Sequence, residues 1–372
     1  MHRFIILCSV ICIAATGPVY SGDDTTAVSV SGYLDSDVWT DFSGNFFSND
    51  ELDMSMTVQF SEKVSASIAA TVASGTIPAG TGRPGGRAVT VYELTNDTFE
   101  LADEYSRWVA VAFDGISLLY ESPAGTFTVG DLVYQFGGFN YYLYKRLSMI
   151  AVESFTRGVG YSFGTDILSQ SIMAGSADID RTGDFAGATS LSFDGSHGAS
   201  LYYGIRGSIH ESFTTASTVF AGLEYTGSIA GMLDLKLDFG LQNLPGDERL
   251  TAYSLLFEPA VSAGRFSTAM SLYAFIDPDS SGANFVDDEF FAYIEPGYSF
   301  TGVIAAGLPL EIHTTDMDAF ADAGQFWAVP TLYVYPAAGV EWWIWGQVAV
   351  PLGDDETGDP AYGLGSEIIM NF

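Results

Sequence analysis

Apolar and polar residues alternate with a period of two along much of the chain. The stretch 231–242 is the cleanest: one face carries Leu233, Leu235, Leu237, Phe239 and Leu241, and the other carries Asp234, Lys236, Asp238 and Gln242. This period is that of a β-strand. A charge facing a dry core is costly unless it is paired, so the polar face is predicted to be wet.

The final stretch, 361–372, repeats the pattern with aromatic residues at both ends of its apolar face, Tyr362 and Phe372, and with Glu367 on the opposite face. Such a strand suits lipid on one side and water on the other. It resembles the closing strand of Gram-negative outer-membrane β-barrels. The resemblance implies that Phe372 is the signal recognised by the barrel-assembly machinery.

The same alternation upstream predicts one domain, residues 22–372, folded as an all-β, transmembrane, antiparallel up-and-down barrel of about 18 strands. The expected strands lie near 27–42, 51–60, 63–73, 104–113, 126–133, 156–163, 167–175, 185–193, 199–209, 216–226, 231–242, 250–261, 265–276, 288–300, 303–313, 325–335, 339–350 and 361–372. The segment Ile116 to Ala124 is ambiguous, so 16 strands are the alternative. Pro259, Pro296 and Pro330 fall within expected strands and are expected at bulges or near the periplasmic rim, because a closed barrel has no free edge.

The connectors mostly alternate between short and long. Gly164 to Asp166 and Gly227 to Ala230 are short, whereas 74–103, 134–155 and 277–287 are long and polar. Membrane barrels have short periplasmic turns and longer outer loops. A soluble sandwich, which is the rival β fold, has no reason to sort its loops in this way.

Composition and charge narrow the class of protein. The chain has 46 acidic residues against 13 Lys plus Arg, a net charge of −33. Nucleic acid is excluded as a partner, because neutralising phosphates requires a basic face. Hydrophobic residues make up 48% of the chain, which argues against disorder. The 41 glycines, 27 phenylalanines and 20 tyrosines fit strands and tight turns.

Residues 1–21 are predicted to be a removable export signal. Arg3 precedes an apolar run, Phe4 to Ala15, that is too short to span a bilayer. Both cysteines, Cys8 and Cys12, lie within it, so the rest of the chain has no thiol for a disulfide or a metal. The expected location is the Gram-negative outer membrane, in contact with its lipid.

Several short motifs make the chain resemble the outer-membrane porins over nearly its whole length. They are Gly32 to Asp35 in the first strand, Thr128 to Asp131 before a glycine-rich stretch, Arg157 to Tyr161 after it, and the terminal Phe372. The resemblance implies passive diffusion of small solutes through a water-filled lumen, usually in trimers. It also implies that the third outer loop, 134–155, folds into the lumen and narrows it.

Charged side chains facing the lumen are the candidate pore-lining residues, because rings of charge select ions. They are Asp35, Asp37, Arg206, Glu224, Asp234, Lys236, Asp238, Glu341 and Glu367, with Lys145 and Arg146 in the third outer loop. Acids outnumber bases, so a cation preference is expected in low salt. For each residue the alternative is that it merely keeps the lumen hydrated.

Two further groups of residues suggest other chemistry. Asp277, Asp279, Ser281 and Asp288 approach the spacing of a calcium-binding loop, although an ordinary acidic outer loop is the alternative and no other cofactor is expected. Tyr202, Tyr333, Trp343 and Trp345 are expected to face inward, as in sugar-specific porins. A channel selective for sugars or carboxylates is therefore an alternative function, and a plugged structural or adhesive barrel is another.

The sequence does not predict an enzyme. Gly160 to Gly164 matches the spelling of a nucleophile elbow, but that motif requires a strand, a strained turn and a helix. Here a strand is expected to run into a short turn.

Overall fold

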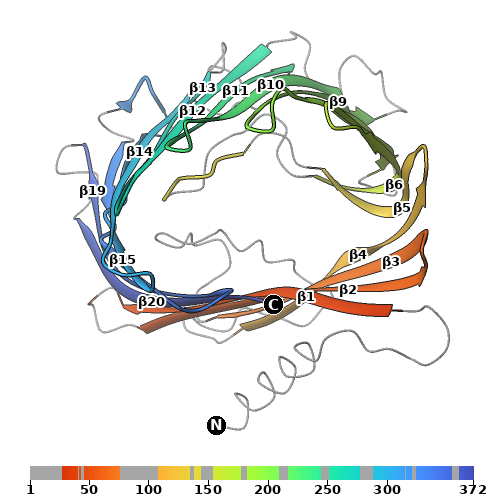
Figure 1. Ribbon diagram of the computed structural model, residues 1–372. Helices are drawn as coiled ribbons and strands as arrows, with labels where there is room; N and C mark the ends of the chain where they lie inside the picture. The colour runs from red at the N-terminus through yellow and green to blue at the C-terminus, as the bar shows by residue number, and fades with distance from the viewer. Residues whose placement is uncertain are drawn as a thin grey trace.

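The computed structural model describes residues 27–40, 42, 46–75, 108–134, 138–143, 154–176, 182–208, 217–243, 251–276, 288–314, 316–320, 324–353 and 360–372. All the strands in these ranges belong to one antiparallel sheet, which closes into a barrel (Figure 1). Among these residues, no helix has the length and apolar character needed to cross a membrane. The strands are β1 (Ala27–Thr40), β2 (Phe46–Ser61), β3 (Val64–Gly75), β4 (Trp108–Ser122), β5 (Gly125–Tyr134), β6 (Ser154–Gly164), β7 (Leu168–Ser176), β8 (Thr182–Ser192), β9 (His197–Ser208), β10 (Ser217–Ile229), β11 (Leu233–Asn243), β12 (Thr251–Ala263), β13 (Phe266–Ile276), β14 (Glu289–Ser299), β15 (Ile304–Gly307), β16 (Leu310–Thr314), β17 (Gln325–Ala328), β18 (Thr331–Ala337), β19 (Val340–Pro351) and β20 (Ala361–Asn371).

The barrel has 18 strands, as predicted, because two of them are each split into two pieces. β15 and β16 both pair with β14, and β17 and β18 both pair with β19. The interruptions fall at Leu308-Pro309 and Val329-Pro330, where prolines cannot donate to the ladder. The alternative of 16 strands is wrong.

Of the two places expected for the three strand prolines, the bulges do not occur, whereas Pro259 and Pro296 lie within the last five residues of β12 and β14, close to the short turns that follow these strands. The register is the same on both sides of Pro259, Pro296 and Pro330, so the ladder is interrupted without an inserted residue. Two of the prolines still accept hydrogen bonds through their carbonyl oxygens: the Leu308 amide donates to Pro296 and the Gly346 amide to Pro330. The barrel wall therefore remains continuous at these prolines, although a proline has no backbone N–H group to donate to the neighbouring strand.

The ambiguous segment, Ile116 to Ala124, belongs mostly to β4, which begins and ends later than expected. The pairing with β3 shifts between Ala69 and Ala70 because Asp114 forms a bulge beside Gly115, whose φ is +135°. Before the bulge an odd-numbered residue, Phe113, is exposed on the outside, and after it the even-numbered Ile116 is. The alternation thus changes phase within one strand, which hid the strand from a period-two search.

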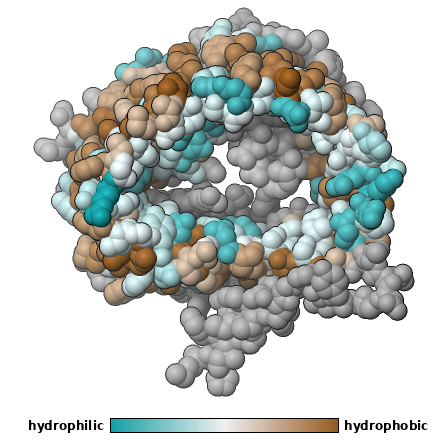
Figure 2. All heavy atoms as spheres, in the orientation of Figure 1, coloured by the Kyte–Doolittle hydropathy of each residue, from teal (hydrophilic) through white to brown (hydrophobic). Residues whose placement is uncertain are grey.

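Short turns connect alternate pairs of strands, at 62–63, 123–124, 165–167, 193–196, 230–232, 264–265, 300–303 and 338–339. Because successive strands are antiparallel, these turns all lie at one end of the barrel, together with the start of β1 and the end of β20. Apolar side chains such as Leu237, Phe239 and Leu364 are exposed on the outer wall, where Figure 2 shows brown patches. This outer surface suits contact with lipid.

The barrel closes between its first and last strands. Tyr33 to Thr40 of β1 pair with Leu364 to Asn371 of β20. The Gly32 amide donates to the Phe372 carbonyl at 2.8 Å, and the Phe372 amide donates to the Gly32 carbonyl at 3.0 Å. Gly32 is required here, because a Cβ would lie 2.5 Å from the Phe372 ring.

The inner face differs between two parts of the barrel. On β2 and β3 it carries mainly small hydroxyl side chains, including Ser55, Thr57, Ser67 and Thr71, together with Asp53; we call this the hydroxyl wall. On β12, β13, β14 and β16 it carries Leu256, Glu258, Tyr273, Phe291, Tyr293 and Glu311; we call this the aromatic wall. The main cluster of buried hydrophobic side chains includes the rings and the leucine of this second wall.

Candidate functional site

Residues 138–143, between β5 and β6, lie inside the barrel against the aromatic wall; we call them the inward segment (Figure 1). Its main attachment is Glu258 of β12. One carboxylate oxygen of Glu258 accepts hydrogen bonds from the backbone amides of Asn140 (2.8 Å) and Tyr141 (3.4 Å). The other accepts from the Asn140 side-chain amide at 2.8 Å. The glutamate therefore binds the backbone and a side chain of the same turn.

Two more side chains, one on β16 and one on β11, hold the ends of the inward segment. The Leu143 amide donates to Oε2 of the buried Glu311 on β16, whose other oxygen lies 3.0 Å from His313 Nδ1. The Lys236 ammonium on β11 donates to the Gly138 carbonyl at 2.6 Å. Each attachment thus has one charged partner: a glutamate carboxylate accepts a hydrogen bond from an amide, or the Lys236 ammonium donates one to a carbonyl oxygen. These hydrogen bonds to charged groups are stronger than neutral ones.

Aromatic contacts fill the space between the segment and the wall. The Phe139 ring packs edge-on against Tyr273 and Phe291, with centroids 4.7 and 5.1 Å away. The Tyr141 ring lies nearly parallel to Tyr293, with an angle of 10° between their planes. Burial, together with the charge of Glu258, raises the pKa of the Tyr141 phenol.

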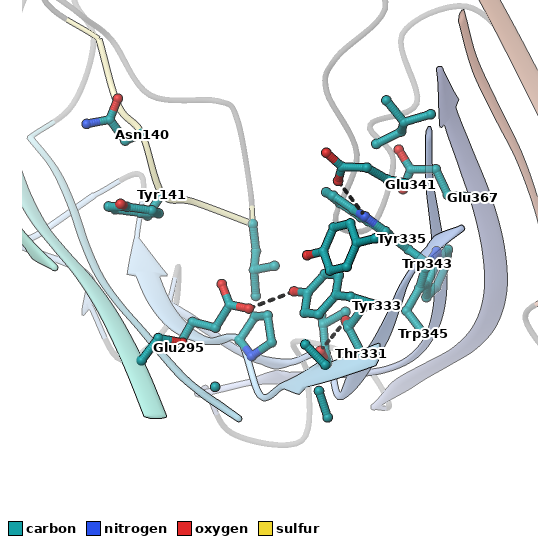
Figure 3. A pocket seen from close by; sticks show the side chains of 18 of the residues that line it. Asn140, Tyr141, Glu295, Thr331, Tyr333, Tyr335, Glu341, Trp343, Trp345 and Glu367 are labelled. Carbon is teal, nitrogen blue, oxygen red and sulfur yellow. Dashed lines mark hydrogen bonds between the residues drawn. The ribbon is translucent and has the colours of Figure 1, made fainter. Parts of the chain in front are cut away.

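Between the inward segment and the end of the barrel that carries the short turns lies a cavity of about 640 Å³, which we call the vestibule. Figure 3 shows that the side chains of its walls converge from β14, β18, β19 and β20, with the inward segment opposite. Its lining includes Asn140, Tyr141, Leu143, Tyr293, Glu295, Thr331, Tyr333, Tyr335, Glu341, Trp343, Trp345 and Glu367. The vestibule is therefore both acidic and aromatic.

Aromatic donors orient two of the vestibule carboxylates. The hydroxyls of Tyr293 and Tyr333 each donate to a different oxygen of Glu295, both at 2.6 Å. The Trp343 indole N–H donates to Glu341 at 3.0 Å. Glu367 is buried on β20 and lies opposite Trp343 in the pairing of β19 with β20. Among the described residues of the lining there is no Lys, Arg or His.

A smaller hollow of about 290 Å³ is lined by Asn140, Tyr141, Asp234, Lys236 and Glu258. Here the Lys236 ammonium lies 3.3 Å from a Glu224 oxygen. Beside the inward segment, Lys236 is therefore paired with Glu224, whereas the described lining of the vestibule holds no basic side chain.

The remaining predicted pore-lining residues are spread around the barrel. Asp35 and Asp37 are buried on the inner face of β1, beside the strand that carries Glu367. Asp238 on β11 accepts a hydrogen bond from the Tyr202 hydroxyl. Arg206 stands on β9 opposite Asp184 of β8. Asp37 is paired directly with Glu367 across β1 and β20, whereas Asp238 and Arg206 lie on β11 and β9, strands that do not neighbour β20.

Some predicted residues lie outside the described ranges. These are the export signal, Lys145 and Arg146, and three of the four calcium candidates, Asp277, Asp279 and Ser281. The fourth, Asp288, accepts a hydrogen bond from the Met317 amide through its backbone carbonyl. Within the described part of the chain, no three His, Cys, Asp or Glu side chains are grouped to hold a metal. Ser162 of the supposed nucleophile elbow lies within β6, which leads through a short turn into β7, so the motif's helix does not follow it.

Of the residues that hold the inward segment, the sequence predicted Lys236 to face the lumen but did not single out Glu258 or Glu311. A usable signal was present: both are acids on the inward face of an otherwise apolar stretch. Their partners are backbone amides far away in the chain, and no sequence pattern reveals such partners.

Taken together, the closed antiparallel barrel, its apolar exterior, its polar lumen and its inward segment define a transmembrane barrel of the outer-membrane porin fold. The chain matches no family model and no curated protein. It is similar to the outer membrane protein OpdK from Pseudomonas aeruginosa, with a TM-score of 0.56 and 10% identity over 93% of this chain and 98% of that one. OccAB4 from Acinetobacter baumannii gives a TM-score of 0.55 and 12% identity over 93% and 97% of the two chains.

A third similar structure is a BenF-like porin from Pseudomonas fluorescens Pf-5, with a TM-score of 0.57 and 9% identity over 93% of this chain and 98% of that chain. At these identities the likeness shows a shared fold. It covers almost the full length of the known structures, so the whole barrel is shared.

Proposed function

We propose that the protein is an outer-membrane channel that lets small hydrophilic solutes and ions diffuse passively through its lumen. The observation that carries this proposal is the vestibule of about 640 Å³ inside a closed barrel, beside the inward segment. In Figure 2 the described strands form a ring around the lumen. The similarity to porin structures supports the same function.

Within this proposal, the channel prefers cations. The vestibule carries Glu295, Glu341 and Glu367 without a cationic side chain among its described lining, and the whole chain has a net charge of −33. Fixed negative charge concentrates cations in a narrow aqueous passage. Salt screens such charge, with a Debye length of about 10 Å at 0.1 M and about 3 Å at 1 M, so the preference weakens in high salt.

The test is single-channel conductance in a planar bilayer, with the reversal potential measured under a salt gradient. We expect steady conductance and a reversal potential on the cation side that moves toward zero at high salt. If well-folded protein gives no conductance, that result would instead favour a plugged structural or adhesive barrel whose outer loops carry the function.

A channel selective for a particular solute is the second candidate. The aromatic lining of the vestibule favours it, and one similar structure is OpdK solved with vanillate. Liposome flux compares the two candidates: a general channel passes solutes according to size, whereas a selective one passes a single chemical class faster than others of the same size.

Three further expectations from the sequence belong to this proposal. Residues 1–21 act as a removable export signal, Phe372 is read by the barrel-assembly machinery, and the channel assembles as a homo-oligomer, with trimers the expected form. The mass of the mature chain, membrane assembly of Phe372→Ala, and the molar mass in detergent test the three separately.

A further inference from the structure

We propose that the outer surface of β5 and β6, around the ion pair of Asp131 and Arg157, is the contact between two copies of this chain. This inference rests on the homo-oligomer expected under the proposed function and names the face through which the copies meet. It is carried by the place of the ion pair, by its hydrogen bonds and by its contrast with the neighbouring part of the wall.

The ion pair lies on the outer face of the barrel. Asp131 and Arg157 are directly opposite each other in the pairing of β5 with β6. By the alternation of a strand, Asp131 shares its face with Val129, and Arg157 shares its face with Val159. Both valines are exposed, and the Arg157 side chain is 71% exposed. A charged side chain on the lipid face of a membrane barrel is unfavourable, so lipid is a poor cover for this surface.

The ion pair also lies within the apolar band of the wall. The Phe127 and Tyr161 rings are 4.7 Å apart, and the Tyr161 hydroxyl donates to the Ala124 carbonyl in a short turn, so these rings lie near the short-turn end. Asp131 and Arg157 each lie four residues further along their strands, which is about 10 Å along the barrel axis at a rise of about 3.4 Å per residue and a tilt of about 40°. The apolar band of such a barrel is about 25 Å tall, so the ion pair faces its interior.

Hydrogen bonds hold the two side chains in place. Arg157 donates from Nε and Nη2 to the two oxygens of Asp131, at 2.7 and 2.9 Å. The Ile116 amide donates to the same carboxylate at 2.8 Å, and a Cβ on Gly115 would lie 2.5 Å from the Asp131 Cβ, so the bulge in β4 makes room for this acid. The guanidinium is therefore held sideways, and its Nη1 group makes no hydrogen bond to the described residues.

The chemistry of the pair favours a second copy over a lipid phosphate. Asp131 balances the charge of Arg157, so a phosphate would gain little net attraction. The pair presents an acceptor and a donor side by side, and a surface of this kind can be complementary to the same surface on a copy. At such a contact, Arg157 of each copy donates to a carboxylate of the other. Hydrogen bonds between charged groups are strong where water and lipid are excluded.

The neighbouring arc of the wall, β10 to β13, lacks this feature (Figure 1). Its exposed outward side chains include Leu223, Leu237, Leu255 and Leu272. Among the described outward positions of these four strands, none carries a charge. This arc suits lipid, and it supplies the control for the test.

Cysteine cross-linking in outer membranes tests the inference on the full-length protein. Val159→Cys places a thiol beside Arg157, and Leu223→Cys is the matched control, because the two positions are 55% and 54% exposed on the outer wall. The natural cysteines lie only at positions 8 and 12, so the wild-type protein gives the background. With a bis-maleimide we expect a two-chain product from Val159→Cys and none above background from Leu223→Cys.

A second variant tests the role of the charges. Asp131→Asn with Arg157→Gln, added to Val159→Cys, removes both charges and keeps side chains of similar shape. We expect at least about tenfold less cross-linked product. If this variant does not fold, the comparison of the two cysteines still decides, because it leaves both charges in place.

Three results would overturn the inference. They are equal cross-linking at Val159→Cys and Leu223→Cys, undiminished cross-linking in the uncharged variant, and no cross-linking at Val159→Cys. If the last result is accompanied by less lipid phosphorus bound to the uncharged variant than to the wild type, then a lipid phosphate covers the pair.

Molar mass in detergent and conductance separate this inference from the proposed function. An oligomer without the Val159→Cys product means that the copies meet through another face. A current without that product leaves the channel standing and removes the contact. Cross-linked protein without a current leaves the contact standing and removes the open channel.

Discussion

The hydroxyl wall and the aromatic wall face the same lumen but differ in what they hold. On the hydroxyl wall, polar side chains bond to one another across strands, as when the Thr71 hydroxyl donates to Asp53 and the Ser55 and Ser67 hydroxyls lie 3.2 Å apart. On the aromatic wall, Glu258 and Glu311 bond to the inward segment. The difference teaches that the aromatic wall uses its acids to hold a segment of the chain inside the barrel, whereas the polar side chains of the hydroxyl wall bond to their neighbours in the sheet.

The largest expected effect comes from removing the attachment on the aromatic wall. Glu258→Ala with Glu311→Ala deletes the acceptors of the Asn140, Tyr141 and Leu143 amides. Hydrogen bonds to charged groups are worth about 1.5–3 kcal/mol each, so the segment should detach from the wall. We expect higher and noisier single-channel conductance. Asp53→Ala on the hydroxyl wall is the control and should leave the current steady; a double variant with the wild-type current would contradict this account.

A stability difference is expected next, in β4, which continues the sheet beyond the hydroxyl wall. Gly115→Ala places a Cβ 2.5 Å from Asp131 Cβ at a φ of +135°. Strained backbone of this kind costs about 1–3 kcal/mol, and the clash adds to it. Unfolding in denaturant with the protein in detergent should report the loss. Gly195→Ala is the matched control, because its φ is also positive, at +77°, but no atom lies within 4 Å of the added Cβ; an equal loss in both variants would show that the clash is unimportant.

Ion selectivity should respond to Lys145 and Arg146, which follow the inward segment in the chain. Lys145→Glu with Arg146→Glu reverses two charges expected near the narrow part of the lumen. We expect the reversal potential to move further toward the cation side at low salt, with a smaller movement at high salt. Unchanged conductance and selectivity would mean that these two residues do not border the constriction.

The smallest expected effect comes from making the hydroxyl wall resemble the aromatic one. Ser67→Phe places a ring on the inner face of β3, opposite Thr57 of β2. We expect a modest fall in conductance with little change in selectivity, because the substitution narrows the lumen without altering charge. Ile68→Phe, which turns its ring to the outer face of the same strand, is the control. Equal currents in both variants would argue that this wall does not border the conducting path.

Much of the fold could be predicted from the sequence because a membrane barrel repeats one simple constraint. In a membrane strand, neighbouring residues such as Leu237 and Asp238 face opposite sides of the barrel wall. The alternation of apolar and polar residues therefore predicts both where a strand lies and which of its faces points outward. The alternation failed at Asp114 and Gly115, where a bulge changes its phase, and the bulges expected at the strand prolines do not occur, because the ladder is interrupted there without an inserted residue. The pattern of neighbouring residues does not predict whether a strand tolerates a bulge or a missing backbone hydrogen bond.

Less of the candidate site could be predicted. Period two placed Glu341 and Glu367 on the inner face, but every inward acid looks alike in a single strand. What distinguishes Glu258 and Glu311 is their bonding to amides of residues 140–143, which depends on how a loop returns to the wall. What distinguishes Glu295 is the pair of tyrosine hydroxyls that meet it, one from its own strand and one from β18.

The reciprocal hydrogen bonds between Gly32 and Phe372 also bear on how the chain folds. Contacts between residues so distant in sequence form slowly, so the pairing of β1 with β20 is expected to be the final step of folding. Until it forms, the incomplete barrel has two unpaired strand edges, each able to pair with another chain. Joining its first and last strands removes both edges at once, so this single seam protects the folded protein from edge-to-edge aggregation.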